Sequence, residues 1–304
     1  MQIEVSPHST QGKRISLVLG SGGARGLAHI GVIRWLEEQG YDICSVSGCS
    51  MGALIGGAYA AGKLDSLEDW FCRIGKVDMV GMLDFSWQKS GLVKGDKVMK
   101  ALTELVGDRM IEDLPIAYTA VATDMKKQKE VWLQSGRLFD AIRASISLPM
   151  FFTPFHLNGM DLIDGGVLNP VPIAPAFNDH SDCIIAVSLG GEPRQQTGAN
   201  AAADLPEKHS ETAQTIYDKL GRWLKPLWGE KDATPPVSSL SVYEVADLAF
   251  DAMQNAIARH KLAVYPPDQL LEVPSDACGT LEFDRAREMI DLGYAMAERE
   301  LKPC

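Results

Sequence analysis

The chain has 304 residues, and its 29 lysines and arginines against 40 aspartates and glutamates give a formal net charge of −11. Nucleic-acid binding needs clustered basic residues to neutralise phosphates, so this acidic balance argues against a nucleic-acid partner. The first residues lack an apolar segment of signal-peptide length, and no stretch approaches the roughly 18 apolar residues of a membrane span. We therefore expect neither secretion by that route nor a spanning helix.

The cysteines are scattered along the chain, without a CxxC pair or a ladder of Cys and His at metal-ligand spacing. This pattern predicts reduced thiols in a cytoplasmic protein, with neither a disulfide framework nor a metal site. The six positions are Cys44, Cys49, Cys72, Cys183, Cys278 and Cys304.

Strand–turn–helix units dominate the first 62 residues. An apolar run at 15–20 and a second run at 43–48 predict strands, and each leads through a glycine-rich turn into a helix, at 24–39 and 53–61. Two such units predict parallel strands with crossover helices. Further along, 115–125 and 129–136 are expected to form neighbouring strands, 138–147 a helix stopped by Pro149, and 161–166 and 183–191 two more strands. The expected fold class is α/β, with a mainly parallel central sheet flanked by helices.

The chain reads as a single domain with one insert. Residues 1–13 are polar and predict a flexible N-terminus, and 14–190 hold the predicted core. Residues 191–240 are rich in polar residues, Pro, Ala and Ser, which predicts a mobile insert containing one short amphipathic helix. The amphipathic patterns at 242–263 and 281–302 predict two helices that pack on the core within 241–304.

Gly48-Cys49-Ser50-Met51-Gly52 is the sharpest chemical signal. Glycines two residues before and after a serine, between a strand and a helix, permit a strained turn that exposes the serine hydroxyl at the helix N-terminus. The pattern therefore makes Ser50 a candidate nucleophile. A serine N-cap on a glycine-rich turn would produce the same pattern without any chemistry.

A serine nucleophile needs a base within hydrogen-bond reach. An α/β-hydrolase would supply a late histidine, but those enzymes place several strands before the nucleophile, whereas this chain places one. His180, His209 and His260 occupy polar loops or a helix end. Asp164 is the better candidate base, because a predicted strand presents it before Gly165 and Gly166, although Asp-Gly is also a common turn pair. A carboxylate has a pKa of about 4, so an apolar pocket would have to raise that pKa.

The loop Gly20-Ser21-Gly22-Gly23-Ala24-Arg25-Gly26 follows the first predicted strand. It matches a dinucleotide fingerprint poorly, because Arg25 stands where the third glycine belongs, and it lacks the Gly-Lys-Ser/Thr of a P-loop. Consecutive glycines before a helix do suit an anion-binding nest of backbone N–H groups. If the first two strands are adjacent and parallel, Ser50 would face an oxyanion hole formed by the Gly22 and Gly23 amides, each donor contributing about 3 kcal/mol.

Together the motifs GSGGARG, GCSMG, ASISLPMFFTP (144–154) and DGG (164–166), in this order, closely resemble the patatin-like phospholipase family. More narrowly, the chain is similar to short bacterial members related to the catalytic domain of neuropathy target esterase. The resemblance covers about residues 14–190 and extends to the C-terminal helices. It implies a Ser50–Asp164 dyad without histidine, and an oxyanion hole in the 22–26 loop, comprising Gly22, Gly23, Ala24, Arg25 and Gly26. Two departures are Ser21, where many members have glycine, and Gly166, where alanine is frequent.

The resemblance implies a serine acyl hydrolase of lipid carboxylic esters that needs no metal or cofactor. The segment 144–154 is expected to shape an acyl pocket, with Phe151, Phe152 and Phe155 supplying apolar area. Two alternatives stay open: a non-catalytic regulatory or scaffold protein on the same fold, and a nucleotide-binding α/β protein, which would leave GCSMG and DGG unexplained.

Residues 213–228 form a locally basic amphipathic segment within the polar insert. Ile216, Leu220, Trp223, Leu224 and Leu227 fall on one helical face, opposite Lys219, Arg222 and Lys225. This arrangement suits either packing on the protein itself or peripheral contact with a membrane, which would place the protein at the inner membrane face. The oligomeric state is not predicted.

Overall fold

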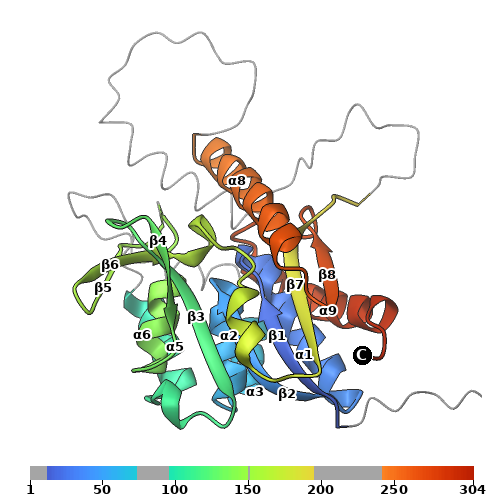
Figure 1. Ribbon diagram of the computed structural model, residues 1–304. Coiled ribbons are helices and arrows are strands. Elements are labelled where there is room, and N and C mark those ends of the chain that lie inside the picture. Colours follow the sequence, from blue (N-terminus) through green and yellow to red (C-terminus); the bar gives the residue numbers. More distant parts are fainter. Residues whose placement is uncertain (1–11, 74–95, 150, 195–241) are drawn as a thin grey trace, which may run out of the picture.

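The structure is a computed structural model that describes residues 12–73, 96–149, 151–194 and 242–304 (Figure 1). The strands are β1 (Arg14–Leu19), β2 (Asp42–Cys49), β3 (Ala117–Asp124), β4 (Lys129–Leu133), β5 (Phe155–Leu157), β6 (Met160–Asp164), β7 (Cys183–Gly191) and β8 (Gln269–Pro274). The α-helices are α1 (Ala28–Glu38), α2 (Met51–Ala60), α3 (Leu64–Arg73), α5 (Asp96–Val106), α6 (Leu138–Ser145), α8 (Val242–Val264) and α9 (Ala286–Glu300). Short 3-10 helices are η1 (Gly23–Leu27), η2 (Ile111–Asp113), η3 (Gly165–Val167), η4 (Ala174–Asn178) and η6 (Phe283–Arg285).

The described strands form one mixed sheet in the order β5-β6-β3-β2-β1-β7-β8, with β4 also paired to β3. The pairs β3–β2, β2–β1, β1–β7 and β7–β8 are parallel, and β3–β4, β3–β6 and β5–β6 are antiparallel. The predicted α/β class with a mainly parallel sheet is confirmed. The central strands β1, β2 and β7 are buried along almost their whole length because helices cover both of their faces.

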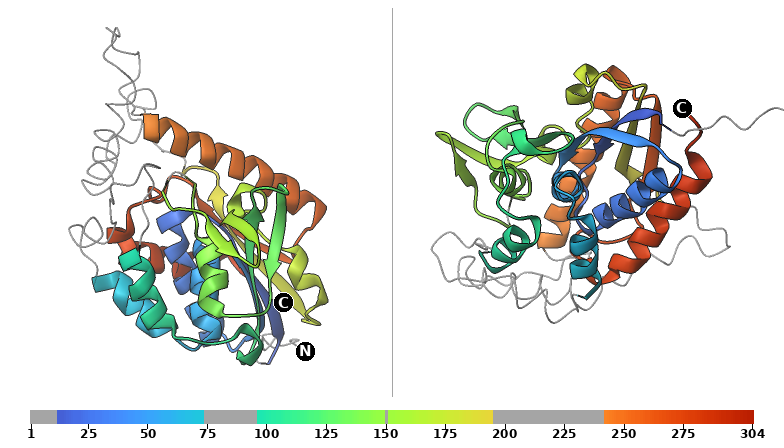
Figure 2. Two further views of the ribbon diagram at one scale, coloured as in Figure 1. Left: turned by 90° about the vertical axis from the view of Figure 1, so that its left-hand side faces the viewer. Right: turned by 90° about the horizontal axis from the view of Figure 1, so that it is seen from below.

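The two faces of the sheet carry cores of different size. Alternate residues of β1, such as Leu17 and Leu19, pack into a large core with α1, α2 and α9. Val18 points the other way, into a small core with Ala186 of β7 and Ala258 of α8. Figure 2 accordingly shows α8 on one side of the sheet and the α1, α2 and α9 layer on the other. Because strand side chains alternate between faces, one short strand binds both layers together.

The start of the first predicted helix differs from the expectation. Residues Gly23–Leu27 form η1, and the regular helix α1 begins only at Ala28. Gly23 has φ +56°, and the Ala24 amide donates to the Thr280 carbonyl at 2.9 Å. The backbone is therefore held to a distant loop before helical geometry can begin. The sequence does not predict the helices α3 and α5 or the strands β5 and β8.

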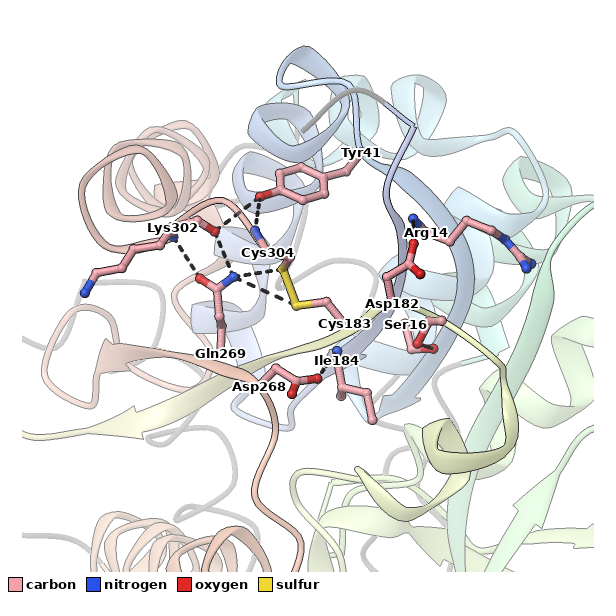
Figure 3. Close-up of a disulfide and its surroundings, with 11 residues drawn as sticks. Arg14, Ser16, Tyr41, Asp182, Cys183, Ile184, Asp268, Gln269, Lys302 and Cys304 are labelled. Carbon is pink, nitrogen blue, oxygen red and sulfur yellow. Dashed lines mark hydrogen bonds between the residues drawn. A yellow bond between two sulfur atoms is a disulfide. The ribbon is translucent and has the colours of Figure 1, made fainter. Parts of the chain in front are cut away.

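The prediction that all cysteines are reduced is wrong for one pair. Cys183, at the start of β7, forms a disulfide with Cys304, 121 residues later (Figure 3). The C-terminal segment is brought there by Gln269 of β8, whose amide nitrogen donates to the Lys302 carbonyl at 2.8 Å, while the Lys302 amide donates back to its side-chain oxygen at 2.8 Å. Spacing in the sequence could not reveal this pair, because only the β7–β8 pairing brings the two ends together. Cys44, Cys49, Cys72 and Cys278 are free thiols.

The predicted amphipathic segment 213–228 lies outside the described residues, as do residues 1–11 and most of the predicted insert. These predictions, and the division of the chain at 14, 191 and 241, stay predictions. In the part of the chain that the structure describes, no helix combines the length and apolarity needed to cross a membrane.

Candidate active site

The two glycine-rich turns lie side by side at one edge of the sheet. β1 and β2 are adjacent and parallel, and Leu19 pairs with Gly48 at their carboxyl ends. The turn that follows β1 (20–26) and the turn that follows β2 (48–52) therefore meet, as the sequence predicted. Ligands of open α/β sheets bind at this carboxyl edge.

Ser50 occupies a strained turn between β2 and α2. Its backbone has φ +55° and ψ −122°, a conformation that costs a non-glycine residue about 1–3 kcal/mol. Both flanking glycines are required by close backbone contacts: a Cβ on Gly48 would lie 2.4 Å from the Gly52 carbonyl oxygen, and one on Gly52 would lie 2.1 Å from that of Leu19. Ser50 occupies the N-cap position of α2, but its side chain makes no capping hydrogen bond. The simple N-cap interpretation is therefore excluded.

Ser145 at the end of α6 supports the Ser50 backbone. Its hydroxyl accepts a hydrogen bond from the Ser50 amide at 2.9 Å and donates to the Val121 carbonyl at 2.6 Å. Ser145 is completely buried, so these bonds are shielded from water. The sequence pattern indicates no separate role for Ser145, although it lies inside the segment 144–154.

Asp164 ends β6, next to β3, and is completely buried. Its Oδ1 accepts a hydrogen bond from the Gly166 amide at 2.8 Å, and the Cys49 thiol lies 3.9 Å from the same atom. Burial raises the pKa of Asp164 from 3.8 to about 6, and hydrogen bonds from Ser50, the Gly166 amide and Cys49 offset part of that rise. A carboxyl with this pKa is a stronger base than one in water.

The Ser50 and Asp164 side chains are neighbours. The Ser50 hydroxyl is close enough to Asp164 to lower its pKa through a side-chain hydrogen bond. Among the described residues, the Oδ2 atom of Asp164 has no partner that meets strict hydrogen-bond geometry. The contact between the Ser50 hydroxyl and Asp164 is therefore looser than a strict hydrogen bond.

In the described residues, no histidine hydrogen-bonds to Ser50 or Asp164. His29 is the buried one: its Nε2 lies 2.9 Å from the Gly20 carbonyl oxygen, and burial lowers its pKa to about 4. Because a carbonyl oxygen only accepts, Nε2 must carry the proton, and the neutral ring holds the start of the 20–26 loop. His156, His180 and His260 are exposed.

The 20–26 loop leaves few amides free to hold an oxyanion. The Gly20, Ser21 and Ala24 amides donate to the carbonyls of Val187, Pro170 and Thr280, at 2.9, 2.8 and 2.9 Å. The Arg25 side chain points towards α8, and Gly26 packs against Met51, where an added Cβ would lie 2.5 Å from that residue's Cβ. Within the described residues, the Gly22 and Gly23 amides have no backbone acceptor among the turn and loop hydrogen bonds. In this described loop, the Gly22 and Gly23 amides are therefore candidate oxyanion donors, whereas the Ala24 amide is already bonded to Thr280.

An apolar cavity of about 100 Å³ adjoins Ser50. The predicted segment 144–154 contributes Phe151 and Phe152, whereas Phe155 does not line it and instead lies 5.6 Å from the Arg143 guanidinium. Much of the remaining lining comes from α3, α5 and the loop before η6, which sequence analysis had not connected to the site. The lining residues are Gly23, Ser50, Met51, Leu54, Trp70, Phe71, Val98, Met99, Leu102, Ile146, Leu148, Phe151, Phe152, Thr280, Leu281 and Phe283.

Gln254 of α8 is a further residue at this edge that sequence analysis missed. It is 6% exposed and hydrogen-bonds with Ser21 next to Gly166. A detectable signal existed: Phe250, Gln254 and Ala258 share one helical face, so a polar side chain stands on a face that otherwise points inwards.

Comparisons with known proteins agree with these motifs. Residues 17–177 match the family model of patatin-like phospholipases. The chain is 39% identical to an uncharacterized NTE family protein of Mycobacterium tuberculosis, over 95% of this chain and 91% of that protein. It is 31% identical to lysophospholipase NTE1 of Pyricularia oryzae, matching 93% of this chain but 18% of that much longer protein. The crystal structure of VipD from Legionella pneumophila aligns with a TM-score of 0.46 and 15% identity, covering 94% of this chain and 66% of VipD. The chain belongs to the patatin-like phospholipase family.

Proposed function

We propose that the protein is a serine hydrolase that cleaves carboxylic esters of lipids with Ser50 and Asp164 as its catalytic dyad. The observation that carries this proposal is the environment of Ser50. Its backbone is strained, its side chain makes no capping hydrogen bond, and it lies beside the buried Asp164 carboxyl, whose pKa is raised, and at the wall of an apolar cavity. Membership of a phospholipase family and relatives named lysophospholipase support the lipid substrate class.

The proposed reaction has two halves. In the first, Ser50 Oγ attacks the ester carbonyl carbon while its proton passes to Asp164, and the Gly22 and Gly23 amides hold the oxygen as it becomes negative. Collapse of this intermediate breaks the ester bond, and Asp164 returns the proton to the departing alcohol oxygen. In the second half, Asp164 takes a proton from water as the water oxygen attacks the carbonyl carbon of the acyl-Ser50 ester. Collapse of this second intermediate breaks the bond to Ser50 Oγ, Asp164 returns the proton to Oγ, and the fatty acid is released.

The cavity favours an acyl chain as the group that is transferred to Ser50. Its walls are almost entirely apolar, so burying the hydrocarbon of a substrate there contributes about 0.8 kcal/mol for each methylene. We therefore propose lipids with an accessible acyl ester, lysophospholipids among them, as the substrate class. Peripheral membrane contact through residues 213–228 belongs to the same proposal.

The test combines a fluorophosphonate probe with hydrolysis of a p-nitrophenyl acyl ester and of a lysophospholipid. The probe should label the wild-type protein on Ser50, and Ser50→Ala should lose both labelling and turnover. The exposed His156, His180 and His260 serve as controls, and their alanine variants should keep substantial activity. Retained hydrolysis in Ser50→Ala would refute the proposed nucleophile.

A further inference from the structure

One face of α8 contacts the carboxyl ends of three strands. Asp251, Gln254 and Asn255 lie on this face, next to Ala258, which anchors the helix in the small core. Asp251 and Gln254 contact the loop that follows β1, Gln254 also contacts the turn that follows β6, and Asn255 packs on Gly190 at the end of β7. The helix therefore touches both loops that carry the proposed chemistry.

The first contact is an ion pair. Arg25 is 4% exposed, and its guanidinium donates to Asp251 at 2.9 Å and to the carbonyls of Ser275 and Cys278 at 3.1 and 3.2 Å. A buried guanidinium with these partners ties the 20–26 loop to α8 and to the segment that precedes η6. Removing either side chain of such an ion pair leaves the other charge buried without a partner, which destabilises the fold.

The second contact joins the loop to the base. The Gln254 side-chain nitrogen donates to Ser21 Oγ at 3.2 Å, and the Gln254 oxygen lies 3.4 Å from the same hydroxyl. Both groups lie against Gly166, where an added Cβ would fall 2.2 Å from the Gln254 nitrogen, 2.7 Å from Ser21 Oγ and 3.1 Å from Asp164 Oδ1. Gly166, which both of these side chains contact, also donates its backbone N–H to Asp164 Oδ1 at 2.8 Å.

We propose that Gln254 is a positioning residue, which sets the distance between the Asp164 base and the oxyanion loop by packing between Ser21 and Gly166. In this arrangement Gly166 is required because a methyl group there would displace the Gln254 amide. The proposal rests on the proposed function, since it assigns Gln254 a role in the reaction of Ser50 and Asp164. It does not place Gln254 in contact with substrate.

The first test compares Gln254→Ala with Met253→Ala, a truncation of the neighbouring side chain, which is 57% exposed on the same helix. Gln254→Ala should lower kcat for a p-nitrophenyl ester by about 10- to 100-fold, as expected for small displacements of catalytic groups, with KM changed by less than about twofold. Met253→Ala should keep the wild-type kcat. Unchanged kcat in Gln254→Ala would overturn the proposal.

Gln254→Glu tests two points: whether residue 254 lies close to Asp164, through the pH profile, and whether a side chain of the same length restores the rate that Gln254→Ala loses. The variant keeps the length of the side chain and an oxygen that can accept from Ser21, but places a second carboxylate beside Asp164. A like charge disfavours ionisation of Asp164, so the acidic limb of the kcat/KM profile should move to higher pH by about one unit. At high pH its kcat should exceed that of Gln254→Ala. An unmoved acidic limb would count against the proposed proximity and overturn it.

A double-mutant cycle covers the case in which Gln254→Ala is poorly folded. Gly166→Ala should lose activity because its methyl group collides with Gln254, and Gly166→Ala combined with Gln254→Ala should recover about fivefold or more, since contacting residues are not additive. Additive losses, or losses that follow the lowered Tm alone, would overturn the proposal. Failure of the proposed function is distinguishable, because wild-type protein would then neither take up fluorophosphonate nor hydrolyse ester.

Discussion

Replacing Asp164 by asparagine should separate activity from stability, because the same buried carboxyl governs both. Burial raises the pKa of Asp164 from 3.8 to about 6, so the folded protein holds this proton more tightly than the unfolded chain. Stability contributed by the group is then fully present below about pH 3.8 and is lost as pH rises through about 6. Asparagine has no charge to bury and still offers an oxygen to the Gly166 amide.

The magnitude follows from the size of the shift. A rise of about two pKa units corresponds to about 3 kcal/mol in the free energy of unfolding. The wild-type protein loses this stability at pH 7, whereas Asp164→Asn does not. In a chain of this size that should raise Tm by about 5 °C at pH 7, with no gain near pH 4. General-base catalysis typically contributes 10²–10⁴-fold, so kcat should fall by at least about 100-fold in the same variant.

Differential scanning calorimetry at pH 4 and 7, together with a pH profile of kcat/KM, measures both effects. In wild-type protein, kcat/KM should fall about tenfold from pH 7 to pH 5, because Asp164 is mostly protonated below its pKa of about 6. Asp161, in the same strand, is the matched control: hydrogen bonds from His156 and Lys126 lower its pKa, so Asp161→Asn should not gain stability at pH 7. An acidic limb near pH 4, or a Tm of Asp164→Asn that does not rise at pH 7, would refute the reasoning.

Three further outcomes are expected. Ser145→Ala should destabilise the fold by about 1–3 kcal/mol, because the buried Ser50 amide loses its acceptor, and should also slow fluorophosphonate labelling; an unchanged labelling rate with lowered Tm would limit Ser145 to a structural role. Cys304→Ser should lower the free energy of unfolding by about 2–4 kcal/mol and make Tm insensitive to reductant. Its kcat should stay unchanged, because the disulfide lies at the opposite edge of the sheet from Ser50. An unchanged free energy of unfolding would contradict this expectation. Replacing Trp223 and Leu227 by glutamate should reduce hydrolysis of liposomal lipid while sparing monomeric ester, if segment 213–228 contacts membranes; an equal loss on both substrates with a lowered Tm would instead mean that the segment packs on the protein.

Local sequence was sufficient for the central strands and for the turns between them. The runs at 15–20 and 183–191 are short and mostly apolar, which indicates buried parallel strands, and 43–48 repeats the strand–glycine turn–helix pattern of the first run. The structure forms β1, β2 and β7 there. The helices α3 and α5 and the edge strand β8 were harder to predict. In β8 only alternate residues are buried, and its pairing partner β7 lies far away in the sequence.

Local patterns are enough to identify the candidate nucleophile, the candidate base and the glycine-rich loop 20–26, because the glycines mark backbone positions where no side chain fits. The groups that support these residues become visible only in the folded chain. Ser21 and Gly166 stood out separately as departures from the family pattern, and only the packing of α8 shows them meeting at Gln254. Only the folded structure shows that the Thr280 carbonyl accepts a hydrogen bond from the Ala24 amide and that Cys183 pairs with Cys304. Each of these contacts joins residues more than 80 positions apart, and such contacts depend on how the helices close over the sheet, which no local pattern encodes.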